Sequence, residues 1–152
     1  MAGSTSPRRA ENKGSVTCAA SSLMAADPAS VRRVLLDVSS APAWNPAFSS
    51  VRAEGEAARA GSAYRVTIRG VVPARLVVDV VEAHLFEYRL EALGSRERGS
   101  WSWTSVEPGV TCVSHAFEHQ GLVAQLLQPA FASVAEWRVG RIRAEVARRA
   151  SG

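Results

Sequence analysis

Residues 74–93 read ARLVVDVVEAHLFEYRLEAL, and the hydropathy pattern of this stretch decides the fold class. Apolar residues recur at every second position in each half of it. They are Leu76, Val78 and Val80 in the first half and Phe86, Tyr88 and Leu90 in the second. A period of two predicts two strands, Ala74–Ala83 and Leu85–Leu93, each with one buried face. Because so short a connector separates them, the two strands are expected to pair antiparallel.

The same period continues in both directions along the chain. Further strands are predicted at Ser15–Met24, Phe48–Ala53, Ala63–Arg69, Gly99–Val106 and Val110–His119. Turn-forming residues separate these segments, namely Gly55, Gly61, Gly70 with Pro73, Gly94 and Pro108-Gly109. Short connectors between successive strands predict an antiparallel meander and exclude β–α–β units.

Helical patterns precede and follow the meander. Asp27-Pro28 predicts a helix start, because Asp is a favoured N-cap and Pro loses no needed hydrogen bond at the first helical position. A corner with two prolines follows at Ser39–Pro46. From Leu122 to Val146, apolar residues recur at intervals of three and four, which predicts a long final helix that Pro129 kinks. A curved sheet that wraps around this helix is expected to leave a cavity.

Several short motifs occur in order along the chain. They are ADPASV at 26–31, Leu36-Asp37, WNP at 44–46, GSAYRV at 61–66, VEA at 81–83, Trp103 before PGVT at 108–111, Gly121-Leu122, and Gln128-Pro129-Ala130. This set resembles the START/Bet v 1-like (SRPBCC) superfamily and, within it, the bacterial polyketide cyclase/dehydrase-like proteins. The resemblance implies an α+β helix-grip fold: a seven-stranded curved antiparallel sheet around a long C-terminal helix, with two short helices between strands one and two.

The length of 152 residues is typical of one domain, which we place at residues 15–150 after a disordered tail at 1–14. The net charge of +4 is concentrated at the ends of the chain. Residues 1–14 carry +2, residues 138–152 carry +4, and the residues between them carry −2. The basic residues from Arg138 onward are expected to complement the dipole at the helix C-terminus. We therefore predict no nucleic-acid partner.

No apolar run is long enough to span a bilayer, and residues 1–15 do not resemble a secretory signal. These patterns predict a cytoplasmic protein without integral membrane association, and a monomer or weak homodimer. Cys18 and Cys112 are too few for a disulfide framework, so we expect thiols. If the strand pairing of the superfamily holds, the two cysteines lie on neighbouring strands.

The expected cavity defines the candidate ligand-binding residues, for each of which ordinary core packing is the alternative. They are Trp44, Phe48, Tyr64, Trp101, Trp103, His115, Phe117, Leu126 and Leu127. Ligand pockets are mostly apolar and aromatic, with a few polar groups that orient the ligand. His115 lies in an inward-facing row, where a neutral imidazole can hydrogen-bond a ligand or a core neighbour. His84 and His119 are expected to be solvated, as are Arg65, Arg69, Glu87 and Arg89 on the convex face.

Two functions remain open at this stage, and neither needs a cofactor or a metal. The three histidines lack metal-ligand spacing, and no nucleophile motif is present. The first function is binding of a hydrophobic small molecule such as a lipid, quinone or polyketide. The second is an enzyme that resembles polyketide aromatase/cyclases, with His115 and Tyr64 as acid–base candidates. A weaker third possibility is that the final helix and its basic end dock a partner or an anionic surface.

Overall fold

The computed structural model describes residues 15–53, 57–121 and 133–152. Its strands are β1 (Ser15–Met24), β2 (Phe48–Arg52), β3 (Ala63–Ile68), β4 (Val72–Val81), β5 (Leu85–Ala92), β6 (Ser95–Glu107) and β7 (Val110–Gly121). Its helices are α1 (Pro28–Leu36), the 3-10 turn η1 (Val38–Ser40), α2 (Ala41–Trp44) and α5 (Val134–Ala150). The predicted tail at 1–14 and the predicted kink at Pro129 lie outside the described residues.

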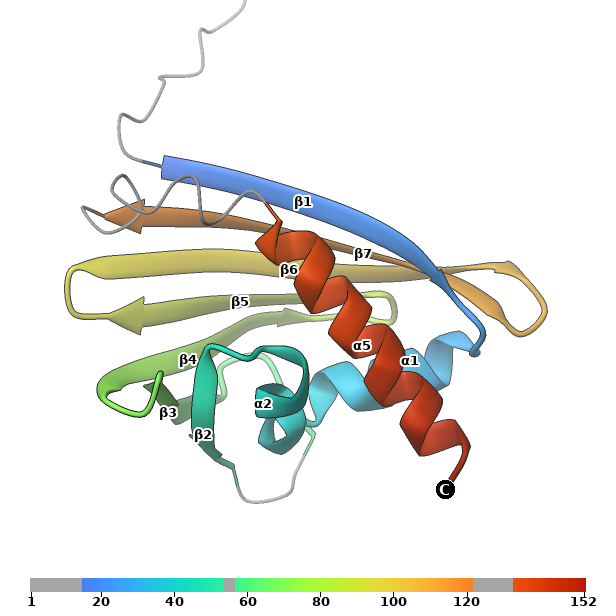
Figure 1. The fold of residues 1–152 in the computed structure, drawn as a ribbon, viewed down its shortest axis with the longest axis horizontal. Helices are drawn as coiled ribbons and strands as arrows, with labels where there is room; N and C mark the ends of the chain where they lie inside the picture. Colours follow the sequence, from blue (N-terminus) through green and yellow to red (C-terminus); the bar gives the residue numbers. More distant parts are fainter. Residues whose placement is uncertain (1–14, 54–56, 122–132) are drawn as a thin grey trace, which may run out of the picture.

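The strands form one antiparallel sheet in the order β1-β7-β6-β5-β4-β3-β2. Successive strands from β2 to β7 are neighbours, and β1 closes the other edge by pairing with β7 from Ser15 opposite Gln120 to Met24 opposite Thr111. Figure 1 shows the curved sheet with α5 crossing one of its faces and α1 and α2 lying beside α5. This confirms the predicted helix-grip fold. No described helix is long and apolar enough to cross a membrane.

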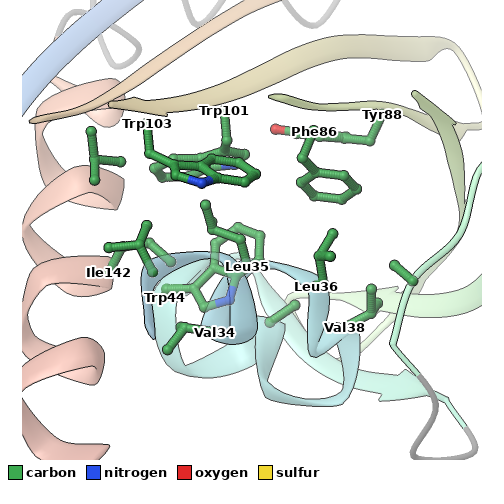
Figure 2. Packing of buried hydrophobic residues seen from close by; sticks show 14 of the residues in the cluster. Val34, Leu35, Leu36, Val38, Trp44, Phe86, Tyr88, Trp101, Trp103 and Ile142 are labelled. Atoms are coloured by element: carbon green, nitrogen blue, oxygen red, sulfur yellow. The ribbon is translucent and has the colours of Figure 1, made fainter. Parts of the chain in front are cut away.

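Helix α1 begins as its sequence predicts. The Asp27 carboxylate accepts a hydrogen bond of 2.7 Å from the Ser30 N–H, and Pro28 is the first helical residue. The buried face consists of Val31, Val34, Leu35 and Leu36. They belong to one core cluster with the aromatic residues of the sheet, and Figure 2 shows Leu35 facing Trp101 and Trp103 and Leu36 facing Phe86.

A β-bulge in β4 corrects one predicted row of the sheet. Val78 lies opposite Tyr88, but Val80 lies opposite Glu87, so one extra residue is inserted between them. The insertion turns Val80 away from the row of Leu76 and Val78. Val81 instead lies opposite Phe86 and packs against the core. Strict alternation across residues 74–83 was therefore the wrong assumption.

Strand β6 begins at Ser95, four residues before the predicted start at Gly99. The segment from Ser95 to Arg98 is polar, so it has no hydrophobic alternation that would mark it as a strand. It is nevertheless paired, with Ser95 opposite Ala92 across the tight turn at Leu93-Gly94. The earlier start puts Glu97 on the buried face, two residues before Gly99 and four before Trp101.

Candidate functional site

The centre of the candidate site is a buried ion pair between α5 and β6. Arg138 Nη1 donates to Glu97 Oε1 at 2.7 Å, and Arg138 Nη2 donates to Glu97 Oε2 at 3.2 Å. The two side chains are 5% and 3% exposed. Two parallel N–H···O bonds fix the guanidinium plane, which a single contact would leave able to rotate. The pair therefore holds Arg138 in one orientation.

Tyr88 and His119 complete the contacts of the Glu97 carboxylate. The Tyr88 hydroxyl donates to Glu97 Oε1 at 2.8 Å, and His119 Nδ1 lies 3.6 Å from Glu97 Oε2. The Tyr88 ring crosses β6 at Gly99, where a Cβ atom would overlap the ring. Gly99 thus leaves the space that lets Tyr88 reach Glu97. The prediction that His119 is solvated was wrong, because its side chain is 12% exposed and faces this carboxylate.

His115 adjoins the ion pair on the side of the guanidinium. Its Nδ1 lies 2.9 Å from the Ser100 carbonyl oxygen, and its Nε2 lies 3.3 Å from Arg138 Nη1. A carbonyl can only accept and a guanidinium can only donate, so Nδ1 carries the proton and Nε2 accepts. The imidazole also stacks on the Trp101 ring, with centroids 3.9 Å apart. The structure thus fixes both the tautomer and the plane of the imidazole.

Burial is the largest single influence on the pKa values of His115, Tyr88 and Glu97. For His115, burial and the nearby Arg138 charge lower the pKa to about 4. For Tyr88, burial and the Glu97 charge raise the pKa well above its ordinary value. Burial opposes ionisation of Glu97, but the Arg138 charge and three hydrogen-bond donors outweigh it and hold the pKa well below the usual range. At neutral pH the cluster therefore holds one carboxylate, one guanidinium, a neutral imidazole and a neutral phenol.

A pocket of about 400 Å³ opens where α5 begins, and we call it the mouth pocket. It is lined by Asn45, Pro46, Ala47, Arg69, Val134, Trp137 and Arg138. Arg138 is 4% exposed, so it forms the base of the pocket, whereas Trp137 is 54% exposed and forms part of its rim. The mouth pocket therefore lies next to Arg138, the residue of the buried ion pair that belongs to α5.

Deeper between the sheet and the helices, aromatic side chains fill the space. An apolar gap there, between Trp44, Phe48, Phe86 and Tyr88, has a volume of about 10 Å³. That is at the lower limit for one water molecule. Trp44 and Trp101 meet edge to face with centroids 5.5 Å apart, and Figure 2 shows Trp101 and Trp103 above the α1 residues. Packed aromatic side chains thus fill the space between Trp44 and Phe86 in the part of the chain that the structure describes.

The predicted ligand-binding residues occupy different places. Trp44, Phe48, Trp101, Trp103, His115 and Phe117 are all buried on the inner side of the sheet or at the α2 corner. Tyr64 is half-buried on β3 and packs against the core, whereas Tyr88 hydrogen-bonds to Glu97 and to Arg138, the residue that also contacts His115. Leu126 and Leu127 lie outside the described residues. The indole N–H groups of the three buried tryptophans have no acceptor in the described ranges.

Two residues of the site escaped the sequence analysis, and each carried a usable signal. Arg138 was assigned to the basic helix end, but it lies in the second turn of α5. It falls on the same helix face as Val139, Ile142 and Val146, and a charge at an apolar position indicates a buried partner. Glu97 continues the inward row of Trp101 and Trp103 at a spacing of two. If the alternation of β6 and the helical period of α5 are continued through polar residues, they predict that Glu97 and Arg138 both face inward.

The two cysteines lie on the neighbouring strands β1 and β7, as the resemblance implied. Cys18 is opposite Phe117 and Cys112 is opposite Leu23, which separates them by five positions of register. That separation corresponds to roughly 17 Å, far beyond disulfide reach. The described cysteines accordingly form no disulfide.

Comparison with known families gives one match, to a family described as "Polyketide cyclase / dehydrase and lipid transport", which spans residues 15–150. Among curated proteins, none matches the sequence significantly.

Solved structures share the fold at low sequence identity. The Zhui aromatase/cyclase from Streptomyces sp. R1128 is 15% identical, with a TM-score of 0.72 over 90% of this chain and 96% of its own. A norcoclaurine synthase from Thalictrum flavum, solved with a transition-state analogue, is 13% identical with a TM-score of 0.67 over 90% and 96%. A START superfamily protein from Mycobacterium smegmatis is 15% identical with a TM-score of 0.61 over 83% and 96%.

Proposed function

The chain belongs to the polyketide cyclase/dehydrase and lipid transport family of the START/Bet v 1 superfamily, and from this premise we propose that it binds a hydrophobic small molecule. The ligand belongs to the class of lipids, quinones and polyketides: an apolar body with at least one oxygen that accepts hydrogen bonds. It enters between the sheet and the C-terminal helix through the mouth pocket. The oxygen binds Arg138 at the base of the pocket.

One observation carries this proposal: Arg138 is rigidly held by Glu97, but its buried Nε–H is left without an acceptor among the described residues. Its Nη1 and Nη2 atoms bond to Glu97, Tyr88 and His115. Leaving a buried N–H of a charged group unsatisfied costs about 1–3 kcal/mol or more, which a ligand oxygen would recover.

The rest of the pocket suits an apolar ligand body. Pro46, Ala47 and Val134 supply aliphatic surface, and the half-exposed Trp137 indole supplies an aromatic wall. Arg69 adds a positive charge at the rim. Because the buried pair is neutral as a whole, this rim charge favours a carboxylate or a polarised carbonyl near the entrance. The indole N–H donors of Trp44, Trp101 and Trp103 offer further polar contacts to a ligand that reaches deeper.

Binding can be tested with 8-anilinonaphthalene-1-sulfonate, which becomes fluorescent in apolar pockets, and with decanoate as a competitor. We expect saturable fluorescence that decanoate displaces. Trp137→Ser should weaken binding by about tenfold, since it removes an apolar wall worth about 1.5–3 kcal/mol when covered. The matched control is Leu23→Ser, an equally exposed apolar residue at 58% against 54% for Trp137.

Two results would contradict the proposal. One is an absence of saturable binding together with an absence of any apolar molecule in native mass spectra of the protein from its own host. The other is equal weakening by Trp137→Ser and by Leu23→Ser, which would show that the probe binds exposed apolar side chains without a defined pocket.

A second candidate function, a polyketide cyclase/aromatase-type enzyme, is favoured by the neutral His115 and Tyr88 beside Arg138. A carbonyl that accepts from the Arg138 Nε–H would be polarised, and its α-proton would become more acidic. Within the same cluster, His115 Nε2 is an unprotonated acceptor and the Tyr88 hydroxyl is a donor, so these two atoms are the candidates for taking up and supplying a proton. In this case His115→Gln should lower turnover of a polyketone by about 10²-fold or more. Unchanged turnover would remove His115 from the reaction.

A further inference from the structure

Two hairpin tips at one end of the sheet expose aliphatic side chains to solvent. The β3–β4 turn at residues 69–71 and the β5–β6 turn at Leu93-Gly94 lie together at the left end of the sheet in Figure 1. Leu93 is 99% exposed, Val71 is 79% exposed and Val72 is 39% exposed. Ala74 lies opposite Ala92, so the register brings Pro73 and Val72 beside Leu93 and Gly94. The exposed residues therefore form one apolar edge, the hairpin edge.

A row of three arginines runs across the outer face of the sheet next to this edge. Arg52 lies opposite Arg65, and Arg65 lies opposite Arg75. All three are exposed, and none forms an ion pair within the described ranges. The next position in the row is Glu91, whose carboxylate bonds to Arg89. Like charges directly opposite each other destabilise a sheet, so the arginine row lowers the stability of this part of the sheet. An anionic partner would reduce the repulsion between the guanidinium groups.

A shallow groove joins the arginine row to the hairpin edge. Its volume is about 1040 Å³, and Arg52, Arg65 and Arg75 line it together with Pro73 and Leu93. A surface that combines guanidinium groups with protruding aliphatic side chains matches the two components of a lipid bilayer surface, its phosphates and its acyl chains.

We propose that this end of the sheet docks on an anionic lipid bilayer. Leu93, Val71 and Val72 insert between the headgroups, and the arginine row contacts the lipid phosphates. Each signal alone gives weak, reversible binding, and the two together give stable attachment. A stable protein interface would need a well-packed patch of about 800 Å² per partner, whereas these aliphatic residues sit on two narrow turns. A bilayer accepts such tips without a complementary shape.

Docking in this way would hold the mouth pocket close to the lipid. Arg69 lies in the β3–β4 turn and also lines the mouth pocket. Two hydrogen bonds tie this turn to the corner of the pocket: the Arg69 N–H donates to the Ala47 carbonyl at 2.8 Å, and the Gly70 N–H donates to Ser49 Oγ at 2.9 Å. The docking inference stands on the hairpin edge and the arginine row, and it does not depend on which ligand the pocket binds.

The test is cosedimentation of the full chain with vesicles of phosphatidylcholine alone or mixed equally with phosphatidylglycerol. We expect binding to the mixed vesicles that falls as salt is raised, because exposed charges are screened within about 10 Å at 0.1 M salt. The tip variant Val71→Asn/Leu93→Asn and the row variant Arg65→Gln/Arg75→Gln should each bind at least about tenfold more weakly. The control is Leu23→Asn/Val106→Asn, which changes two residues, 58% and 53% exposed, at the opposite end of the sheet and should bind as the unmodified protein does.

Several outcomes would overturn the proposal. One is a lack of binding to the mixed vesicles at low salt. Another is that the tip variant and the control variant weaken vesicle binding equally, while all variants keep the melting temperature of the unmodified protein. If inorganic phosphate at the same phosphate concentration displaces the vesicles, or if the row binds single-stranded oligonucleotides while the tip variant has no effect, the arginine row is an anion site and not a bilayer surface.

Discussion

Neutralising only one member of the Glu97–Arg138 pair should lower the free energy of unfolding far more than neutralising both. In Glu97→Gln the guanidinium remains 5% exposed and loses its counter-ion. Leaving one member of a buried ion pair uncompensated costs about 3–5 kcal/mol, against a total stability of about 5–15 kcal/mol for a domain of this kind. The same loss is expected for Arg138→Met, which leaves the Glu97 carboxylate buried without its cation.

The double variant Glu97→Gln/Arg138→Met keeps the side-chain volumes and removes both charges. Since replacing a whole buried pair by neutral groups of similar size is often neutral or stabilising, we expect its free energy of unfolding to lie within about 1 kcal/mol of the unmodified protein. The coupling energy between the two sites is then about 5 kcal/mol or more, because the two single losses sum to at least about 6 kcal/mol and the double variant loses at most about 1 kcal/mol. It would be measured by urea unfolding at pH 7, followed by the fluorescence of the buried Trp101 and Trp103.

The double variant also separates stability from function. It should fold but bind decanoate at least about tenfold more weakly, because the Arg138 Nε–H donor is lost. Single variants that each lose less than about 1 kcal/mol would refute the account of the pair as buried and charged. A double variant as unstable as the sum of the two single losses would refute the mutual compensation.

Three further variants test other parts of the structure. The folded pKa of His115, about 4, lies below its ordinary value of 6.5, so the stability from its neutral form is complete above pH 6.5 and is lost as the pH falls towards 4. The unmodified protein should thus lose about 2 kcal/mol between pH 7 and pH 5 in urea unfolding, and His115→Gln should lack this loss; identical pH slopes would contradict the buried neutral imidazole. Arg69 has a φ of 49°, so Arg69→Gly should raise stability by about 1 kcal/mol while weakening anionic probe binding, and a drop in melting temperature would count against this. Gly99→Ala should cost about 1–3 kcal/mol by displacing the Tyr88 ring, whereas the control Gly140→Ala, with nothing within 4 Å of the added Cβ, should stabilise α5; equal melting temperatures would exclude the close approach of Tyr88.

The fold could be predicted from the sequence because its signals are local and repeated. Each strand from Phe48 to His119 has its own alternation, and glycine turns separate most of them. Asp27-Pro28 marks the start of α1 by a mechanism that acts within three residues. The bulge in β4 could not be predicted in this way, since Val80 and Val81 are equally apolar and pairing with β5 decides which one faces the core.

The candidate site was harder to predict, because its central contact joins residues 41 positions apart. Glu97 and Arg138 each look like surface charges in their own segments. Their burial follows from the packing of α5 against the inner face of the sheet, which no local pattern encodes. The aromatic residues around them were identified, but their assignment as pocket walls required the packing that fills the interior around Trp101.

We propose that the Arg138 Nε–H beside the mouth pocket binds an oxygen of the ligand. The most direct measurement follows the arginine Nε–H signals in ¹H–¹⁵N correlation spectra during a decanoate titration, with the Arg138 signal assigned by its loss in the Glu97→Gln/Arg138→Met variant. We predict a saturable shift of the Arg138 signal together with the Trp137 indole signal, while the Arg65 signal on the outer face stays unchanged. Saturable binding of decanoate that leaves the Arg138 signal in place would contradict the account.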